Sequence, residues 1–464
     1  MDLISIINIS SSLIFVLILY LGYLRSHHRI DLSDCFYVFI SFFFLYGILG
    51  QYNKIRLDTF SLDVYFMAAI LVFIAMLTIF ILRMIFFKQY SFQGAELVHK
   101  NQIAKIFMIA GMIATIIGYI FFYLNYSRLG SITEIFFSLE NRTDRNAALT
   151  EQRGNLPFTH FLYTGIMLIF SSRLLSKKRI GEALYFTFLF LGPLLLFYLV
   201  DGERTALLKY IVGMFFIAIF FHFREPIYAK KRHLALFIIG FMVMGFLGNF
   251  RGPIGLALIE GSTEPIVKRI ERKQKKGALA IFIPNEFPAV NFTMNRVIFN
   301  HTEEGAAYLY GASYAHAIPY LFPRTVYDGF GTTKPMTIAD NLGEELRLEV
   351  GRIRKMGFGM SPLGESFANF GIFGPIFFSL LVFFWLRLLY FAIYSKYPVF
   401  VFWAALQTPT LFMLNRSAFS SIFSGIVWTS AIFITSYFLA AFIYFILPKI
   451  QSNIRRNEKN IFSC

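Results

Sequence analysis

The stretch at residues 64–87 reads VYFMAAILVFIAMLTIFILRMIFF. Its one charged residue is Arg83, and the run is longer than the roughly 20 apolar residues that cross a bilayer as a helix. Further candidate spans lie at 3–24, 35–51, 104–126, 156–175, 183–200, 205–223, 234–249, 367–394, 398–414 and 424–447. Of these, 234–249 is short, and 398–414 is interrupted by Gln407, Thr408 and Pro409. The sequence therefore predicts an all-α, polytopic membrane protein with about 11 transmembrane helices, in which residues 1–464 form a single membrane domain.

The composition supports this class. Hydrophobic residues make up 57% of the chain and charged residues 15%, whereas a soluble domain carries about 25% charged residues. The net charge of +16 would suggest nucleic acid in a soluble protein. Here the charge lies in short loops between apolar runs, so we interpret it as a topology determinant and expect no nucleic-acid partner. Cys35 and Cys464 are the only cysteines, which argues against a structural disulfide or a metal cage.

The loop charges predict the orientation of the chain. Lys and Arg gather after the first, third, fifth and seventh runs, between the ninth and tenth, and in the tail, as at Arg25, Lys88, Lys177, Lys231 and Lys459. With eleven spans these residues all fall on one side, which the positive-inside rule makes the cytoplasm. We therefore expect the N-terminus outside and the C-terminus inside.

Three segments then face outward, at 127–155, 201–204 and 250–366. The last is an extracytoplasmic loop region between the eighth and ninth spans, far longer than the roughly 15 residues above which a loop is usually functional or disordered. It contains the apolar and aromatic stretch Ala306–Phe322, so we expect it to fold against the membrane surface.

Outward-facing arginines are the main candidates for chemistry, because the planar guanidinium matches phosphate oxygens. They are Arg128, Arg142, Arg145, Arg153, Arg204, Arg251, Arg324, Arg352 and Arg354, with Lys355 beside them. The simpler interpretation of any single one is a solvated charge or a side chain that reaches lipid headgroups. Arg204 differs, because the turn Asp201-Gly202-Glu203-Arg204 lies between two long apolar runs, and charges near membrane depth are costly and often functional.

Glu365 precedes the ninth span in a stretch rich in Gly and Pro. Its carboxylate could complement a helix dipole, or it could act as a general base towards a substrate hydroxyl. Both interpretations stay open on the sequence.

No metal-site or nucleotide motif is present: the chain lacks HExxH, CxxC and a Walker loop. An enzyme of this sequence would therefore receive an already activated substrate, with no cofactor. The basic run KRIERKQKK at 268–276 is interpreted as a solvated or headgroup-facing helix.

Three motifs carry a resemblance to a known family. They are Gly202-Glu203-Arg204 at the start of a span, PYLFPR at 319–324, and GFGMSPLGESFANFGIFG at 357–374 leading into the next span. With the span number and the large late outer loop, the chain resembles the Wzy-type polymerases of bacterial O-antigen, enterobacterial common antigen, capsule and exopolysaccharide.

The resemblance implies a GT-C-like, metal-independent glycosyltransferase at the outer face of the bacterial cytoplasmic membrane. It would join undecaprenyl-pyrophosphate-linked repeat units and release undecaprenyl pyrophosphate. Implied partners are these lipid-linked glycans, the bilayer, a Wzz-like chain-length regulator and a flippase. The related ligases are assigned a histidine base, and no histidine here matches it.

Residue roles follow from the resemblance. Arg204 and Arg251 would bind the pyrophosphate and stabilise the leaving charge, Arg324 would do the same or hold the acceptor, and Glu365 would take the proton of the attacking hydroxyl. The remaining substrate-binding candidates are Arg142, Arg145, Arg153, Asp201, Arg352, Arg354 and Lys355.

Three other functions compete with polymerisation. An O-antigen-type ligase would share the fold and donor but use another acceptor. A lipid-linked oligosaccharide flippase or other transporter would often show inverted repeats and broken helices, and no repeat is evident in the sequence. A purely structural membrane protein is the third, and the outward arginines count against it.

Overall fold

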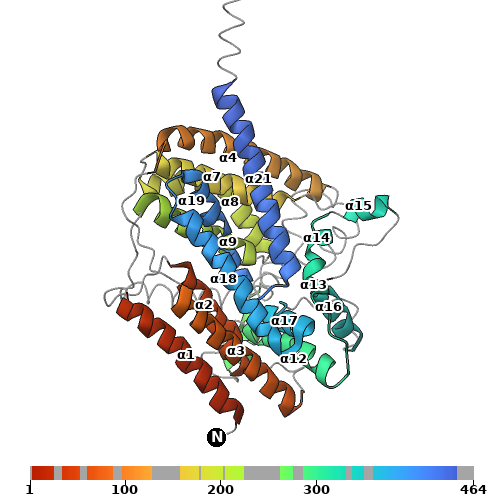
Figure 1. Ribbon diagram of the computed structural model, residues 1–464. Helices are drawn as coiled ribbons and strands as arrows, with labels where there is room; N and C mark the ends of the chain where they lie inside the picture. Colours follow the sequence, from red (N-terminus) through yellow and green to blue (C-terminus); the bar gives the residue numbers. More distant parts are fainter. Residues whose placement is uncertain are drawn as a thin grey trace, which may run out of the picture. The chain divides into compact units, whose positions relative to one another are not determined.

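The computed structural model describes residues 3–25, 34–52, 60–86, 97–127, 157–176, 179–201, 204–223, 262–274, 286–322, 324–330, 337–349 and 359–446. Every regular element in these ranges is a helix (Figure 1). The predicted all-α class is confirmed for this part of the chain.

Six of the described helices are long and apolar enough to cross a membrane: Leu3–Leu24, Leu62–Phe86, Lys100–Asn125, Phe158–Leu175, Pro362–Ile393 and Phe419–Phe445. Shorter apolar helices lie at Cys35–Gln51, Ile180–Leu195, Leu207–Phe223 and Pro398–Met413. Each predicted span except 234–249 coincides with one of these helices, and 234–249 lies outside the described residues. The chain is thus a helical protein with several helices that can span a bilayer.

The chain divides into two compact units, which are described one at a time. Unit 1 contains residues 1–91, 226–390 and 408–424, and unit 2 contains 92–225, 391–407 and 425–464. Helices α18 (Gly374–Ile393) and α21 (Phe419–Phe445) begin in unit 1 and end in unit 2.

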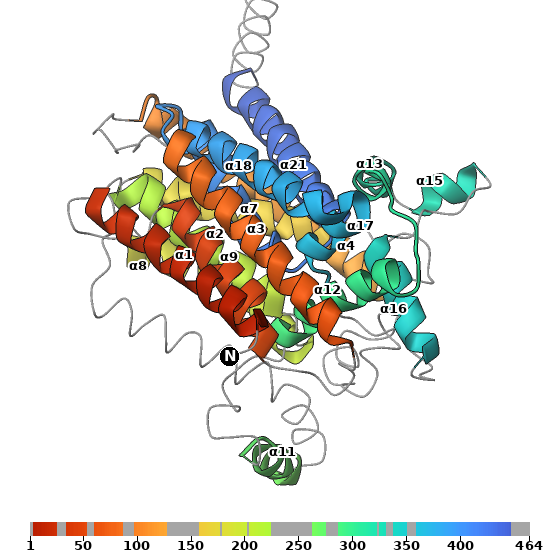
Figure 2. The ribbon, with the colours of Figure 1, turned by 60° about the horizontal axis from the view of Figure 1, so that its bottom comes forward.

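Unit 1 contains most of the described elements. Its other α-helices are α1 (Leu3–Arg25), α2 (Cys35–Phe43), α3 (Leu62–Phe86), α11 (Glu264–Gln274), α12 (Glu286–Thr302), α13 (Ala312–Ala315), α14 (Ala317–Tyr320), α15 (Arg324–Gly329), α16 (Ile338–Glu349), α17 (Pro362–Phe370) and α20 (Thr410–Met413). Helix α2 runs on into a π-helical turn, η1 (Phe44–Ile48), and a 3-10 turn, η2 (Leu49–Tyr52), and another 3-10 turn, η7 (Gly371–Phe373), joins α17 to α18. Helices α1 and α3 lie side by side (Figure 2).

The start of α2 is tied to two other helices by one carboxylate. Asp34 caps α2, because its side chain accepts a hydrogen bond of 2.8 Å from the backbone N–H of Phe36. Arg83 near the end of α3 donates to Asp34 Oδ2 at 3.0 Å, and the hydroxyl of Tyr390 on α18 donates to Oδ1. The Arg83 guanidinium also lies 4.5 Å from the Phe36 ring centroid. The single charge within the run at 64–87 is therefore paired.

Helix α12 belongs to the interior of unit 1, although it comes from the segment predicted to be an outer loop. It packs against α3, α17 and the turns after α2. Residues 290–298 are all buried, Phe292 and Ile298 among them, and the Phe60 ring lies 5.6 Å from that of Phe292. Segment 250–366 therefore contributes a buried helix to the fold.

Unit 2 is built around one buried helix. Its helices are α4 (Lys100–Tyr126), α7 (Phe158–Leu175), α8 (Ile180–Asp201), α9 (Arg204–Ile217), the π turn η5 (Ala218–Phe223) and α19 (Pro398–Gln407). Most residues of α7 are buried, and it packs against α4, α8, α9 and α19.

Glycines set the close approach of α4 and α7. A Cβ at Gly165 would lie 2.5 Å from Thr115 Oγ1 and 2.9 Å from the carbonyl oxygen of Gly111. A Cβ at Gly118 would meet Leu162 in the same way. Small residues at such contacts let helix backbones approach closely, which is how helices associate in lipid.

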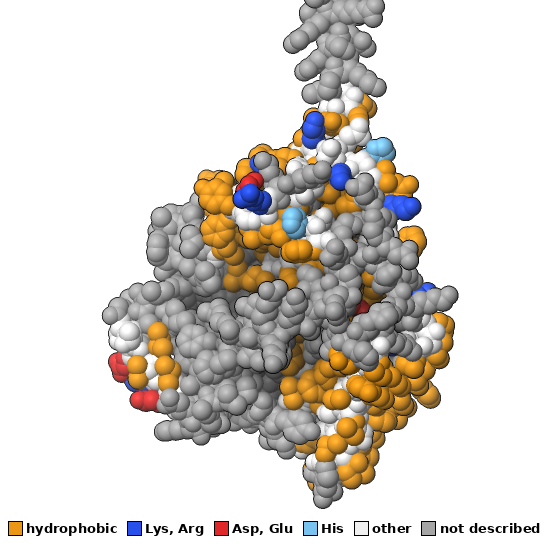
Figure 3. All heavy atoms as spheres, turned by 90° about the vertical axis from the view of Figure 1, so that its left-hand side faces the viewer, with side chains coloured by type: hydrophobic (Ala, Val, Ile, Leu, Met, Phe, Trp, Pro, Cys, Tyr) orange, Lys and Arg blue, Asp and Glu red, His pale blue; other side chains and the backbone are white. Residues whose placement is uncertain are grey.

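Large apolar side chains are exposed on the long helices. Leu13 on α1 is 63% exposed, Phe384 on α18 67% and Phe438 on α21 67%. Figure 3 shows hydrophobic side chains over most of the described surface on one face, with charged side chains in small groups. Such surfaces are expected where a helix faces lipid rather than water.

Candidate functional site

Two helices flank the predicted turn at 201–204. Helix α8 ends at Asp201 and α9 begins at Arg204, in unit 2. Arg204 is therefore the first residue of an apolar helix, where unsatisfied N–H groups and the helix dipole favour an anion. The structure does not describe the side chains of Asp201 and Arg204.

The other predicted site residues fall into two groups. Arg324 is the first residue of α15, with a side chain outside the description, and Glu365 lies in the first turn of α17. Outside the described residues are Arg142, Arg145, Arg153, Arg251, Arg352, Arg354 and Lys355. The convergence of arginines on one substrate thus stays a prediction.

Glu365 is buried, with 1% of its surface exposed, and both its carboxylate oxygens accept hydrogen bonds. Ser313 Oγ donates to Oε1 at 2.8 Å, and the backbone N–H of Phe419 donates to Oε2 at 2.7 Å. Phe419 is the first residue of α21, so the carboxylate of α17 satisfies an N–H group at the start of another helix. A substrate hydroxyl would have to displace one of these donors or share a carboxylate oxygen with it, and the role of Glu365 as a base stays a prediction.

Asn369, one turn after Glu365, holds the loop before α13. Its Oδ1 accepts from the backbone N–H of Gly311 at 3.0 Å, and its Nδ2 donates to Ser313 Oγ at 2.7 Å. The same amide donates to the carbonyl oxygen of Glu365 at 2.7 Å. Glu365, Ser313, Asn369 and the Phe419 N–H group form one connected set, called the Glu365 network below.

Tyr314 lies beside this network. Its hydroxyl and Ser366 Oγ are 2.6 Å apart, and its ring centroid is 4.9 Å from that of Phe419. Burial and the neighbouring Glu365 carboxylate raise the pKa of Tyr314, so its hydroxyl stays protonated at neutral pH.

A second polar cluster consists of Arg296 and Asn300 on α12, Glu304 just after it, and Glu345 on α16. Arg296 is 8% exposed, and its Nη2 lies 2.9 Å from Glu345 Oε1 and 3.6 Å from Glu304 Oε1. Asn300 Nδ2 donates to the same Glu345 carboxylate at 3.1 Å. The cluster joins α12 to α16, and we call it the Arg296 cluster.

Sequence reasoning missed the polar residues of α12. Asn291, Thr293, Asn295 and Arg296 are all buried. Thr293 Oγ1 accepts from the backbone N–H of Ser361 at 3.2 Å and donates to the carbonyl oxygen of Gly359 at 2.9 Å, which fixes the start of α17. The i, i+4 spacing of Asn291 with Asn295 and of Arg296 with Asn300, within an otherwise apolar run, is the pattern that could have indicated them.

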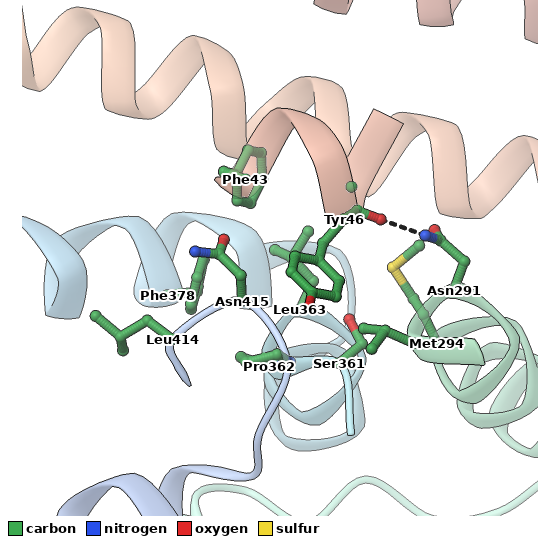
Figure 4. Close-up of a pocket in the computed structure, with 12 residues that line it drawn as sticks. Phe43, Tyr46, Asn291, Met294, Ser361, Pro362, Leu363, Phe378, Leu414 and Asn415 are labelled. Atoms are coloured by element: carbon green, nitrogen blue, oxygen red, sulfur yellow. Dashed lines mark hydrogen bonds between the residues drawn. The ribbon is translucent and has the colours of Figure 1, made fainter. Parts of the chain in front are cut away.

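A small cavity lies where irregular turns of unit 1 meet (Figure 4). Its lining includes Tyr46 from the π turn after α2, Asn291 from α12 and Leu363 from α17. About 20 Å³ of it can be occupied by water, which is room for about one molecule and not for a sugar ring. Asn415 also lines it, and its buried Oδ1 has no hydrogen-bond partner within the described structure, so a water molecule fits the chemistry of the site.

Within the described ranges, no group of three or more His, Cys, Asp or Glu side chains is arranged to hold a metal ion. No family model matches the chain, and neither a curated protein nor a solved structure matches it.

Proposed function

We propose that this protein polymerises undecaprenyl-pyrophosphate-linked oligosaccharide repeat units at the outer face of the bacterial cytoplasmic membrane. The proposal includes eleven spans, a GT-C-like arrangement, and an N-terminus outside with the C-terminus inside. Lipid-linked glycans are both donor and acceptor, and a Wzz-like regulator and a flippase act with it.

The observation that carries the proposal is the position of Arg204 at the first residue of α9, immediately after the break that follows α8. A helix N-terminus and a guanidinium at one position form a suitable environment for a pyrophosphate. A topology that puts this turn on the outer face, together with the long outward segment, supports a substrate presented there.

The reaction needs only a base and a site for the leaving charge. A hydroxyl of the acceptor sugar attacks the anomeric carbon of the donor, a glycosidic bond forms, and the bond from that carbon to the pyrophosphate oxygen breaks. The hydroxyl proton passes to the base, for which Glu365 is the candidate. Arg204, Arg251 and Arg324 stabilise the negative charge on the leaving pyrophosphate.

The test uses Arg204→Ala and Glu365→Gln in cells that depend on this protein for polymer, with the chain-length ladder read on a gel. Loss of one charge-stabilising group typically lowers a rate about 10²–10³-fold, so Arg204→Ala is expected to leave mainly single repeat units. Arg179→Ala removes an exposed arginine from a predicted cytoplasmic loop and is the matched control. Normal ladders from both test variants, at wild-type protein levels, would contradict the proposed active site.

A lipid-linked oligosaccharide transporter is the second candidate, and the broken helices favour it. Helix α2 passes through π and 3-10 turns, α17 and α18 are separated at Gly371, and α19 and α20 meet at Pro409. Discontinuous helices commonly form transporter sites. If lipid-linked units fail to reach the outer face in cells without the protein, transport replaces polymerisation. Single units that accumulate there support the polymerase, and loss of attachment to the final acceptor alone indicates the ligase.

A further inference from the structure

Residues 306–322 combine three unusual properties. The stretch has no Asp, Glu, Lys or Arg, it contains Tyr308, Tyr310, Tyr314 and Tyr320, and much of it is exposed. Tyr310 is 82% exposed, Ile318 61% and Phe322 50%. A solvated loop would be expected to carry charge, whereas exposed Tyr and aliphatic side chains without charge are typical of the membrane–water interface.

The stretch is fixed to the corner between α17 and α18. The backbone N–H groups of Leu309 and Tyr310 donate to the carbonyl oxygens of Ala368 and Asn369 at 2.9 and 3.1 Å. The Tyr308 ring stacks on His301 with centroids 5.1 Å apart.

The backbone conformation at Tyr310 directs its side chain away from the core. Its φ is 46°, a left-handed value that non-glycine residues rarely adopt, and the next residue, Gly311, has φ 90°. The hydrogen bonds to α17 hold this conformation, and the Tyr310 ring stays outside the core of unit 1.

The level of this corner in a bilayer follows from the length of α18. Its 20 residues span about 30 Å, the thickness of the hydrocarbon core. Gly374, its first residue, is then close to the edge of that core. The Tyr314 ring packs 5.2 Å from Phe377, one turn into α18, and 6.1 Å from Phe370, just before it. Residues 308–322 are therefore held beside the start of α18.

Apolar side chains are also exposed directly before α18. Phe373, directly before α18, is 70% exposed, and Ile372 beside it is 46% exposed. Gly371, just before them, is buried against the Tyr308 ring, since a Cβ there would lie 3.3 Å from that ring.

We propose that residues 308–322 form an interfacial segment that lies in the headgroup layer of the membrane. Tyr310, Ile318 and Phe322 contact lipid, and the Tyr310 hydroxyl faces the polar layer. The segment anchors the middle of the long outward region, 250–366, to the bilayer beside α18. This inference depends on the membrane class of the chain and not on the reaction proposed above.

The test measures depth in the bilayer directly. Tyr310→Cys, Phe322→Cys, Phe373→Cys and Thr302→Cys are each made with Cys464→Ser, since the remaining Cys35 is buried. Each variant is labelled with a small fluorophore and placed in phosphatidylcholine nanodiscs whose acyl chains carry bromine at a shallow or a deep position. Phe373 is the lipid-facing reference, and Thr302, exposed beside Glu303 and Glu304, is the aqueous control.

The labels at Tyr310 and Phe322 are expected to be quenched like that at Phe373, more by shallow than by deep bromine, while the Thr302 label keeps its fluorescence. If Tyr310 and Phe322 behave like Thr302 while Phe373 is quenched, the proposal is overturned. A change of their emission with added soluble oligosaccharide instead of lipid would identify a glycan surface and would also overturn it.

The unaltered protein gives a second readout that no cysteine substitution can disturb. Photoactivated phosphatidylcholine with a diazirine near the headgroup is expected to crosslink within residues 308–322 and at Phe373. Crosslinks at Phe373 without any in residues 308–322 would overturn the proposal.

Discussion

The contact of α4 with α7 in unit 2 and that of α12 with α17 in unit 1 hold helices together by opposite means. Helices α4 and α7 meet through Gly111, Gly118 and Gly165, whose missing side chains let the backbones touch. Helices α12 and α17 meet through polar groups, with Thr293 between them and the Glu365 network and the Arg296 cluster around them.

The difference predicts which kind of substitution destabilises each contact. Lipid tails are as apolar as the side chains that face them, so helix association there depends on close packing and hydrogen bonds rather than on hydrophobic burial. The first contact should be damaged by added atoms, and the second by lost partners. Three substitutions test this contrast, in order of expected effect.

The largest effect is expected from Gly165→Ala. The new Cβ would lie 2.5 Å from Thr115 Oγ1 and 2.6 Å from the Thr115 backbone nitrogen, so a helix must move. Overpacking of this kind lowers the free energy of unfolding by about 3 kcal/mol. The measurement is the melting temperature in detergent, with the monodisperse fraction from size exclusion.

Gly425→Ala on α21 is the control, because a Cβ there meets nothing within 4 Å. Helix propensity alone should stabilise this variant, by up to about 1 kcal/mol. Equal melting temperatures for the two alanine variants would show that the α4–α7 contact is not limited by space.

A smaller loss is expected from Glu365→Ala, which removes the acceptor of both Ser313 Oγ and the Phe419 N–H group. Leaving buried donors without partners costs about 2 kcal/mol after relaxation. Glu365→Gln keeps the shape and an acceptor oxygen, so its melting temperature should lie closer to wild type. If Ala and Gln destabilise equally, the charge rather than the hydrogen bonds holds the network.

The smallest effect is expected from Arg296→Ala, which breaks the pairs with Glu345 and Glu304. The arginine is buried, but 37% of the Glu345 side chain and 46% of the Glu304 side chain are exposed, so water can solvate the carboxylates that remain. A loss of about 1 kcal/mol in the free energy of unfolding is expected in thermal denaturation. Lys268→Ala, which removes one member of an exposed pair with Glu264, should leave the melting temperature unchanged. If the melting temperature of Arg296→Ala is also unchanged, the ion pairs of the Arg296 cluster do not contribute to stability.

Part of the candidate site could be found from the sequence. Glu365 and the turn at Arg204 stand out because charged residues are rare between apolar runs, and α9 does begin at Arg204. The partners of Glu365 could not be found in this way. Ser313 lies 52 residues away and Phe419 54 residues away, and no local pattern brings these positions together.

The sequence by itself determined that the chain is helical and which of its runs are apolar enough to span a membrane. The reason is local: a backbone in lipid must satisfy its own N–H and C=O groups, and about 20 apolar residues do so as one helix. Only the tertiary structure decided that α12, from a segment expected to lie outside, is buried among other helices. Its Asn, Thr and Arg side chains indicate a loop when they are considered alone. They can be buried because Gly359, Ser361 and Glu345, more than 40 residues further along the chain, supply their hydrogen-bond partners.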